Sequence, residues 1–208
     1  MTGGLELDTR DLAPSLFLWP PAKPVPKSTI LRFLANAAHL RAVPTSACHP
    51  EQTISLPACI KPDIGTLGIG FRAIATLGEW RSFLETHPEP AAFVVQPFLM
   101  GTETRTTLCA NGTYASAELL ERVETRSRWR DSTSTLAVEW LDDLGDVLGQ
   151  IATQVIGVDI IDANGVAYLL DINVAPALAV HLVTQTPRNL AAAVLDSWLS
   201  SRPNGRRS

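Results

Sequence analysis

Three oxygen-bearing side chains stand between residues 156 and 173, inside segments that are otherwise apolar. Asp159, Asp171 and Asn173 lie among Ile, Val and Leu residues on either side of an Asn-Gly pair. Asn-Gly between apolar runs is a strong β-hairpin signal, so we expect strands over residues 156–161 and 166–172. A carboxylate in such strands is costly unless a cation or hydrogen-bond donors compensate its charge. The trio therefore predicts a cation-binding hairpin, with a hairpin whose acidic ends face water as the alternative.

The length of the turn decides whether the three side chains meet. Side chains alternate along a strand, so Asp171 and Asn173 share a face. A two-residue turn would send Asp159 to the opposite face, whereas a three-residue loop beginning at Ala163 would pair Asp159 with Leu169 and unite the trio. We expect the three-residue loop. Two carboxylates and an amide carbonyl are hard oxygen ligands, which suit Mg²⁺ carrying nucleotide phosphates better than Zn²⁺.

A lysine followed by a glycine-rich segment lies earlier in the chain. The run Leu56–Ile60 predicts a strand, which leads into Lys61 and then into Gly65, Gly68 and Gly70. Glycines let backbone amides approach phosphate closely, and a lysine at a strand end would add a point charge. The segment fits neither the Walker pattern nor the dinucleotide fingerprint.

The remaining pattern predicts the elements that would carry these groups. Apolar periodicity indicates helices over residues 29–39, 77–84, 138–155 and 188–199, with Ser28 and Thr76 as the first two N-caps, and strands over residues 71–74, 92–96, 102–109 and 114–120. The mixed-charge run over residues 121–130 is typical of a solvated loop. Clustered prolines favour an extended arm over residues 1–26.

Composition narrows the class of protein. The 208 residues are 46% hydrophobic and 18% charged, which describes a globular chain able to bury a full core. With a net charge of −4 and no basic block, we expect no nucleic-acid partner. We also expect no membrane partner, because no apolar run reaches the ~18 residues of a membrane span. There is no secretory signal pattern, and the three cysteines lack metal-site spacing, so we expect a reduced, cytoplasmic setting.

The hairpin resembles the metal-binding hairpin of the ATP-grasp superfamily, whose usual form is Gly-x-Asp, a turn, then Glu-x-Asn-x-x-Pro. Gly157-Val-Asp159 and Asp171-Ile-Asn173-Val-Ala-Pro176 occupy those positions here, with Asp171 in place of the usual Glu. The sequence after the hairpin is similar to that in cyanophycin synthetases, and the motifs also resemble those of ribosomal-protein glutamate ligases. The resemblance implies an α+β ATP-grasp fold, with two lobes of antiparallel sheet, residues 27–95 and 96–208, clasping ATP.

The resemblance also implies roles for basic and glycine residues. Lys27 and Lys61 would contact nucleotide phosphates, and Gly65, Gly68 and Gly70 would form a lid over them. For Lys27, an exposed lysine beside a helix cap is the alternative. Such ligases usually carry an N-terminal substrate domain, which is short or missing here. This implies a fragment, or a homodimer or partner chain that supplies the domain.

Other implied roles lie in the second lobe. Gln96, Phe98 and Leu99 would form the hinge that binds the base. Arg105, in Gly101-Thr-Glu103-Thr-Arg105, would bind phosphate or a substrate carboxylate, with a Glu103–Arg105 surface pair as the alternative. An Arg at the end of the strand over residues 114–120 would point at the transferred phosphate, and Arg122, two residues after Leu120, is the candidate for it. The Asp159, Asp171 and Asn173 trio would hold Mg²⁺.

The implied activity is that of an ATP-dependent carboxylate–amine ligase. A substrate carboxylate would attack the γ-phosphate to give an acyl phosphate, and an amine would displace phosphate to form an amide or peptide bond. Amino acids or peptides are the implied substrates. The alternative from another class is a non-catalytic ATP-binding module that works with a partner chain.

Overall fold

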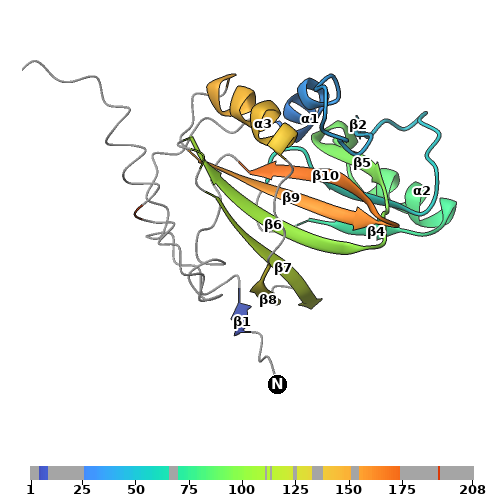
Figure 1. The fold of residues 1–208 in the computed structure, drawn as a ribbon. Coiled ribbons are helices and arrows are strands. Elements are labelled where there is room, and N and C mark those ends of the chain that lie inside the picture. The colour runs from blue at the N-terminus through green and yellow to red at the C-terminus, as the bar shows by residue number, and fades with distance from the viewer. Residues whose placement is uncertain are drawn as a thin grey trace, which may run out of the picture.

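The structure is a computed structural model that describes residues 5–8, 26–65, 70–110, 112, 114–123, 126–132, 138–150, 155–173 and 192. Within this part of the chain, two β-sheets built from antiparallel strand pairs combine with α-helices in an α+β fold (Figure 1). The sheets have six and four strands. The larger sheet carries the predicted hairpin and the smaller one carries Lys61.

The larger sheet is a continuous antiparallel array covered by two helices on one face (Figure 1). Its strands, in spatial order, are β1 (Leu5–Asp8), β8 (Arg126–Asp131), β7 (Tyr114–Val123), β6 (Thr102–Cys109), β9 (Val155–Ala163) and β10 (Val166–Asn173). The covering helices are α1 (Lys27–Leu34) and α3 (Val138–Gln150). Their apolar faces pack with alternate strand residues into one buried cluster, which includes Leu31, Leu34, Leu108, Leu144, Ile156, Val158 and Leu169.

The smaller sheet has its own core. Its strands, in spatial order, are β2 (Ser46–Ala47), β5 (Phe93–Pro97), β3 (Ala58–Pro62) and β4 (Arg72–Ile74), with a short 3₁₀ helix (Pro90–Ala92) before β5. Helix α2 (Leu77–Thr86) packs Trp80 and Phe83 against Ile60. The predicted cap is present: Thr76 Oγ1 accepts from the Glu79 amide, and the Glu79 carboxylate accepts from the Thr76 amide, a reciprocal capping box.

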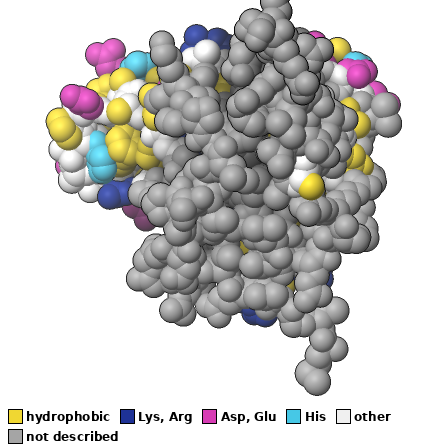
Figure 2. Space-filling model, turned by 90° about the vertical axis from the view of Figure 1, so that its left-hand side faces the viewer, with side chains coloured by type: hydrophobic (Ala, Val, Ile, Leu, Met, Phe, Trp, Pro, Cys, Tyr) yellow, Lys and Arg dark blue, Asp and Glu magenta, His cyan; other side chains and the backbone are white. Residues whose placement is uncertain are grey.

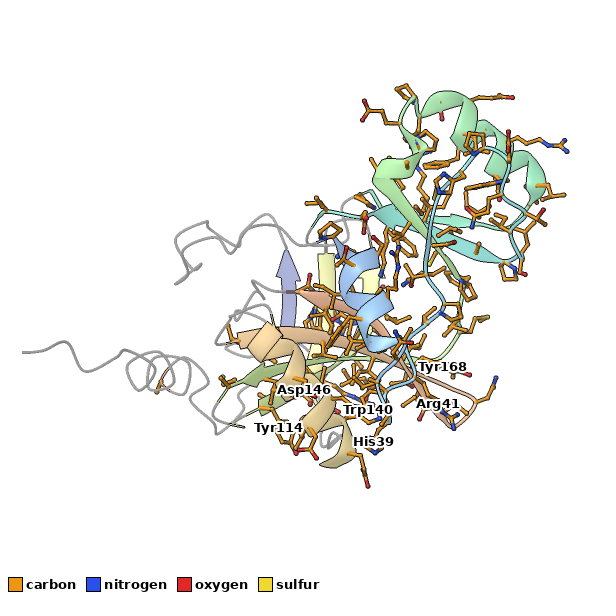
Figure 3. All side chains as sticks on the ribbon, turned by 90° about the horizontal axis from the view of Figure 1, so that it is seen from above. His39, Arg41, Tyr114, Trp140, Asp146 and Tyr168 are labelled. Carbon is orange, nitrogen blue, oxygen red and sulfur yellow. The ribbon has the colours of Figure 1, made fainter. Side chains whose placement is uncertain are left out.

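Two close backbone approaches fix the segments that lead to and from the larger sheet. The segment after α1 runs beside the outer edge of β10, where the Leu169 amide donates to Arg41 O and the Val43 amide donates to Leu169 O. In Figure 3, α1 lies between α3 and the smaller sheet, and His39 and Arg41 lie on the segment that leaves it. At the start of β6, a Cβ on Gly101 would lie 1.9 Å from the carbonyl oxygen of Asp162, so only glycine fits this approach.

Several predicted boundaries are wrong, for physical reasons that lie elsewhere in the chain. Helix α1 covers residues 27–34 and not 29–39, and its N-cap is Pro26, not Ser28. Beyond its end, the His39 and Leu40 amides donate to the carboxylate of Asp143 on α3, which holds the chain out of the helical path. The helix predicted to reach residue 155 ends at residue 150 as α3, because Val155 begins β9. Strand β3 extends to residue 62, which puts Lys61 inside it.

The charged run predicted to be a loop forms strands. Strand β7 continues to residue 123, and β8 pairs with it. Across this pair, Arg130 Nη2 lies 2.7 Å from Glu118 Oε1 and Arg128 Nη1 lies 3.3 Å from Glu121 Oε2, while Trp129 is buried. Opposite charges at cross-strand positions stabilise the pairing that the local sequence disfavours. Strand β1, within the predicted extended arm, pairs with the other edge of β8.

Some predictions lie outside the described residues: Gly68, the 188–199 helix apart from Ala192, and most of the arm over residues 1–26. The division into lobes at residues 95 and 96 remains a prediction. Acidic, basic and apolar side chains are interspersed along the visible rim of the molecule (Figure 2). In the described part of the chain, no helix is both long and apolar enough to cross a membrane.

Candidate functional site

The hairpin of β9 and β10 brings the carboxylates of Asp159 and Asp171 to the same face, but through a turn and register that differ from the prediction. The turn has two residues, Asn164 with φ 57° and Gly165 with φ 78°, so the predicted three-residue loop is wrong, as is the pairing of Asp159 with Leu169. A two-residue turn alone would separate the carboxylates. The register shifts at a β-bulge between Leu169 and Asp171, beyond which Asp171 pairs directly with Asp159.

Residues that pair directly across two strands project on the same side of a sheet, so the bulge restores the shared face. Asn173 follows two residues after Asp171, opposite Gly157. The expected convergence of Asp159 and Asp171 is therefore present, although the turn that was to produce it is not.

Arg105 clamps the first carboxylate. It lies opposite Asp159 on β6, and its Nε and Nη2 donate to Oδ1 and Oδ2 of Asp159 at 2.6 and 2.7 Å. The guanidinium carbon lies 5.2 Å from the ring centroid of Trp129, a cation–π contact. Burial acts to lower the pKa of Arg105, but the opposing attraction of Asp159, with contributions from Glu103 and Asp171, holds that pKa above its ordinary value.

Two lysines from different elements meet the second carboxylate. Lys27 Nζ, at the first residue of α1, lies 2.7 Å from Asp171 Oδ2, and Lys61 Nζ, from the smaller sheet, lies 3.5 Å from the same oxygen. All three side chains are at most 14% exposed. The predicted alternative of an exposed Lys27 is therefore wrong.

The bulge also supplies an acceptor for the smaller sheet. The carbonyl of Leu170, the extra residue of the bulge, accepts from Lys61 Nζ at 2.8 Å and from Gln96 Nε2 at 3.2 Å. Gln96 Nε2 also donates to Thr45 Oγ1 at 2.8 Å. One backbone irregularity thus aligns the carboxylates and anchors the facing strands β3 and β5.

The other predicted residues are less closely engaged. Gly70 has φ 81°, and a Cβ there would lie 2.8 Å from Pro62 Cγ, so this position favours glycine, while Gly65 also lies beside Pro62. The Phe98 amide donates to Pro57 O, and Leu99 follows it in the irregular segment between β5 and β6. The backbone of Arg122 lies in β7, and its side chain is outside the described residues.

Two contributors to the site were missed from the sequence. Trp129 is the one aromatic residue in the charged run over residues 121–130, and a large apolar side chain in such a run was the available signal that this position is buried. Asp63 follows the Lys61-Pro62 pair, and its carboxylate accepts from the amide and hydroxyl of Ser28, both at 2.7 Å. No local sequence pattern predicts that the carboxylate of Asp63 accepts hydrogen bonds from a residue 35 positions away.

The donor set fits a hard divalent cation together with an anionic ligand. Carboxylate oxygens are the ligands that hard divalent cations prefer, and Asp159 and Asp171 already form ion pairs with protein cations. Among the described residues, no group of three or more His, Cys, Asp or Glu could hold a metal. Further oxygen ligands would therefore come from Asn173 and from the ligand itself, as in magnesium–phosphate sites.

The sequence matches no protein-family model and no curated protein. The fold, however, is similar to solved ligase structures. The D-alanine–D-alanine ligase of Bacillus anthracis, complexed with ATP, is 16% identical over 84% of this chain and 64% of its own, with a TM-score of 0.57. PsnB, an ATP-grasp ligase complexed with a minimal precursor, is 15% identical over 84% and 60%, with a TM-score of 0.62.

An L-amino acid ligase from Bacillus licheniformis is 15% identical over 82% of this chain and 46% of its own, with a TM-score of 0.60. The chain thus spans 46 to 64% of the length of these three proteins. At 15 to 16% identity and TM-scores of 0.57 to 0.62, what these structures share with this chain is the fold. This chain has the ATP-grasp fold.

Proposed function

We propose that the chain is an ATP-dependent carboxylate–amine ligase that acts on amino acids or peptides. One observation carries the proposal: cations from both sheets and from α1 converge on two directly paired carboxylates. Lys27 and Lys61 reach Asp171, and Arg105 clamps Asp159. Three cationic side chains beside two carboxylates suit a triphosphate bound together with a divalent cation better than a triphosphate alone or a cation alone.

Charge balance favours an anionic ligand between the sheets. The ion pairs join three protein cations to two carboxylates, and Glu103 adds a third negative charge that acts on Arg105. With Mg²⁺ bound, the positive charge would exceed the negative charge, and nucleotide phosphates would restore the balance. Lysine acts as a point charge toward phosphate, whereas the planar guanidinium of Arg105 can form paired hydrogen bonds with it.

In the proposed reaction, a substrate carboxylate attacks the γ-phosphorus and ADP leaves. An amine then attacks the acyl phosphate, phosphate leaves, and an amide bond forms. Lys27, Lys61 and Arg105 would neutralise the charge that develops on the transferred phosphoryl group. Arg122 is proposed as a further cation, Gly65, Gly68 and Gly70 as phosphate contacts, and Gln96, Phe98 and Leu99 as the base-binding segment.

Mg²⁺ would be held by Asp159, Asp171 and Asn173. It would supply charge neutralisation of the β- and γ-phosphates. The side chain of Asp171 is one methylene shorter than the Glu usual at this position. Because Asp171 pairs directly with Asp159 across the hairpin, its carboxylate lies on the same face as that of Asp159 even with the shorter side chain.

The names of the similar structures support the substrate class. One is named as a D-alanine–D-alanine ligase, one as an L-amino acid ligase, and one was solved with a minimal precursor. Amino acids and peptides are therefore the first carboxylates and amines to test, and a partner chain or second copy is proposed to complete the substrate site.

ADP release from the full chain tests the proposal. We expect saturable release that depends on Mg²⁺ and on one amino acid or peptide from a panel. Asp171→Asn should lower the rate by about 100-fold, since it weakens the proposed hold on the Mg²⁺ that would neutralise the reacting phosphates. Asp162→Asn is the matched control on the same hairpin, because its carboxylate accepts from the Gly165 amide in the turn, and it should keep the rate.

A non-catalytic nucleotide-binding module is the second candidate. It is favoured by the observation that protein cations already engage both carboxylates. Mg²⁺-dependent nucleotide binding without amine-dependent ADP release would support this module over the ligase.

A further inference from the structure

Helix α1 receives its N-terminal cap from a distant residue. The first amides of a helix have no partner within it, and Ser, Thr, Asp or Asn at the N-cap usually accepts from them. Here the N-cap is Pro26, which makes no side-chain cap hydrogen bond. Instead, Asp63 Oδ1 accepts from the Ser28 amide and Oδ2 from the Ser28 hydroxyl, both at 2.7 Å, and Asp63 O accepts from the Lys27 amide at 2.9 Å.

Asp63 is itself held firmly at the end of β3. It directly follows Pro62, the last residue of that strand, and its amide donates to Ala92 O at 2.9 Å. The cap therefore joins α1, which packs on the larger sheet, to the smaller sheet.

The capped end of α1 is the end that carries Lys27. Its ammonium lies 2.7 Å from Asp171 Oδ2. A lysine stem has several rotatable bonds, so the position of its backbone decides whether the ammonium meets this oxygen at low entropic cost. A helix end left uncapped frays, and fraying would release Lys27 first.

The cap also selects which groups can meet phosphate. A free helix N-terminus attracts anions through its amides and its dipole. The carboxylate of Asp63 occupies that position on α1, and the amides of Lys27 and Ser28 are both engaged. The ammonium of Lys27, rather than the helix amides, is what α1 offers to a ligand.

We propose that Asp63 is a positioning residue of the nucleotide site, whose carboxylate caps α1 and thereby holds the Lys27 ammonium against Asp171. This inference rests on the proposed nucleotide-binding function. It predicts that Asp63 affects nucleotide affinity only through Lys27.

A double-mutant cycle in the full chain tests this dependence. ADP affinity with Mg²⁺ is measured by calorimetry for the wild type, Asp63→Ala, Lys27→Met and the double variant. We expect each single change to weaken affinity by about tenfold, and the double variant to be no weaker than Lys27→Met, because coupled residues do not act additively. Asp63→Asn, which keeps hydrogen-bonding capacity toward Ser28, should recover part of the affinity.

The cap of α2 offers a matched control. Glu79 accepts from the Ala75 and Thr76 amides at 2.7 and 3.0 Å and completes the capping box of α2, a helix that packs on the smaller sheet. Glu79→Ala should lower the melting temperature without changing ADP affinity. Losses from Asp63→Ala and Lys27→Met that multiply in the double variant, or an Asp63→Ala variant with wild-type affinity, would overturn the proposal.

A second readout does not require nucleotide. The reaction of Lys27 with an amine-acylating reagent, followed by mass spectrometry, reports how well its ammonium is held. Asp63→Ala should accelerate labelling of Lys27 by about tenfold, whereas labelling of Lys61, which shares Asp171 but also donates to Leu170 O at 2.8 Å, should change less. Unchanged Lys27 labelling would refute the positioning role, whereas absent ADP binding by the wild type with faster labelling in Asp63→Ala would refute only the proposed function.

Discussion

The two faces of the larger sheet use the same strands for opposite purposes. On β9, Val158 is fully buried under the helices, and its neighbour Asp159 projects to the other face to meet Arg105. On β10, Ile172 joins the core and Asp171 joins the lysines. One face is stabilised by the packing of apolar side chains and the other by ion pairs. Substitutions on the two faces should therefore change the free energy of unfolding and the ADP affinity in different ways.

The largest effect is expected from breaking the charge balance. Asp159→Ala removes the carboxylate that forms both hydrogen bonds to the buried guanidinium of Arg105, which should lower the free energy of unfolding by about 4 kcal/mol. The double variant Arg105→Met, Asp159→Leu removes both charges and should recover most of that loss, because well-packed apolar residues can replace a buried ion pair. Urea denaturation measures both, and equal losses in the two variants would contradict this account.

A smaller effect is expected from emptying volume on the other face. Ile156→Ala creates a cavity beneath α1 and α3 and should cost about 3 kcal/mol of unfolding free energy. Because this side chain belongs to the packed face, ADP affinity of the folded variant should stay within about twofold of the wild type. An affinity loss as large as that of Lys27→Met would show that the faces are not independent.

The smallest effect is expected from raising the pH, because two buried thiols lose their protons less readily in the folded chain than in the unfolded one. Burial raises the pKa of the Cys48 thiol from 9.0 to about 12, and that of Cys109 to about 11. The folded chain therefore keeps these protons above pH 9, where the unfolded chain releases them. Stability is full below pH 9 and should fall as pH rises toward the folded-state values, by about 1.4 kcal/mol per pH unit for each thiol.

Urea denaturation at pH 8 and pH 10 measures this slope. Cys48→Ala removes one thiol and should give a shallower dependence than the wild type, because the unfolded chain then has one proton fewer to release. Identical slopes would indicate that Cys48 is not protected from ionisation in the folded chain.

Much of the scaffold follows from local sequence signals. The bounds of β6 agree with the predicted strand, and Thr76 caps α2 as expected, with Glu79 completing the capping box. These elements depend on alternation and on residues three positions apart, which a sequence displays directly. The ATP-grasp fold itself was anticipated from the hairpin residues and is confirmed by the structural similarity.

The details that depend on distant partners did not follow from the sequence. The bulge at Leu170 is stabilised by Lys61 and Gln96, which come from the other sheet, so the hairpin alone cannot specify its register. The start of α1 depends on Asp63 for the same reason. Strand β8 forms in a charged segment because its arginines find glutamates on β7.

The outer border of β10 is covered at one point by the chain itself. Residues 41–43 lie along β10 at Leu169, where the Leu169 amide donates to Arg41 O and the Val43 amide donates to Leu169 O. Unpaired strand borders are templates for the addition of foreign strands and for aggregation. A strand from another molecule could not pair with β10 at Leu169 without first displacing this segment.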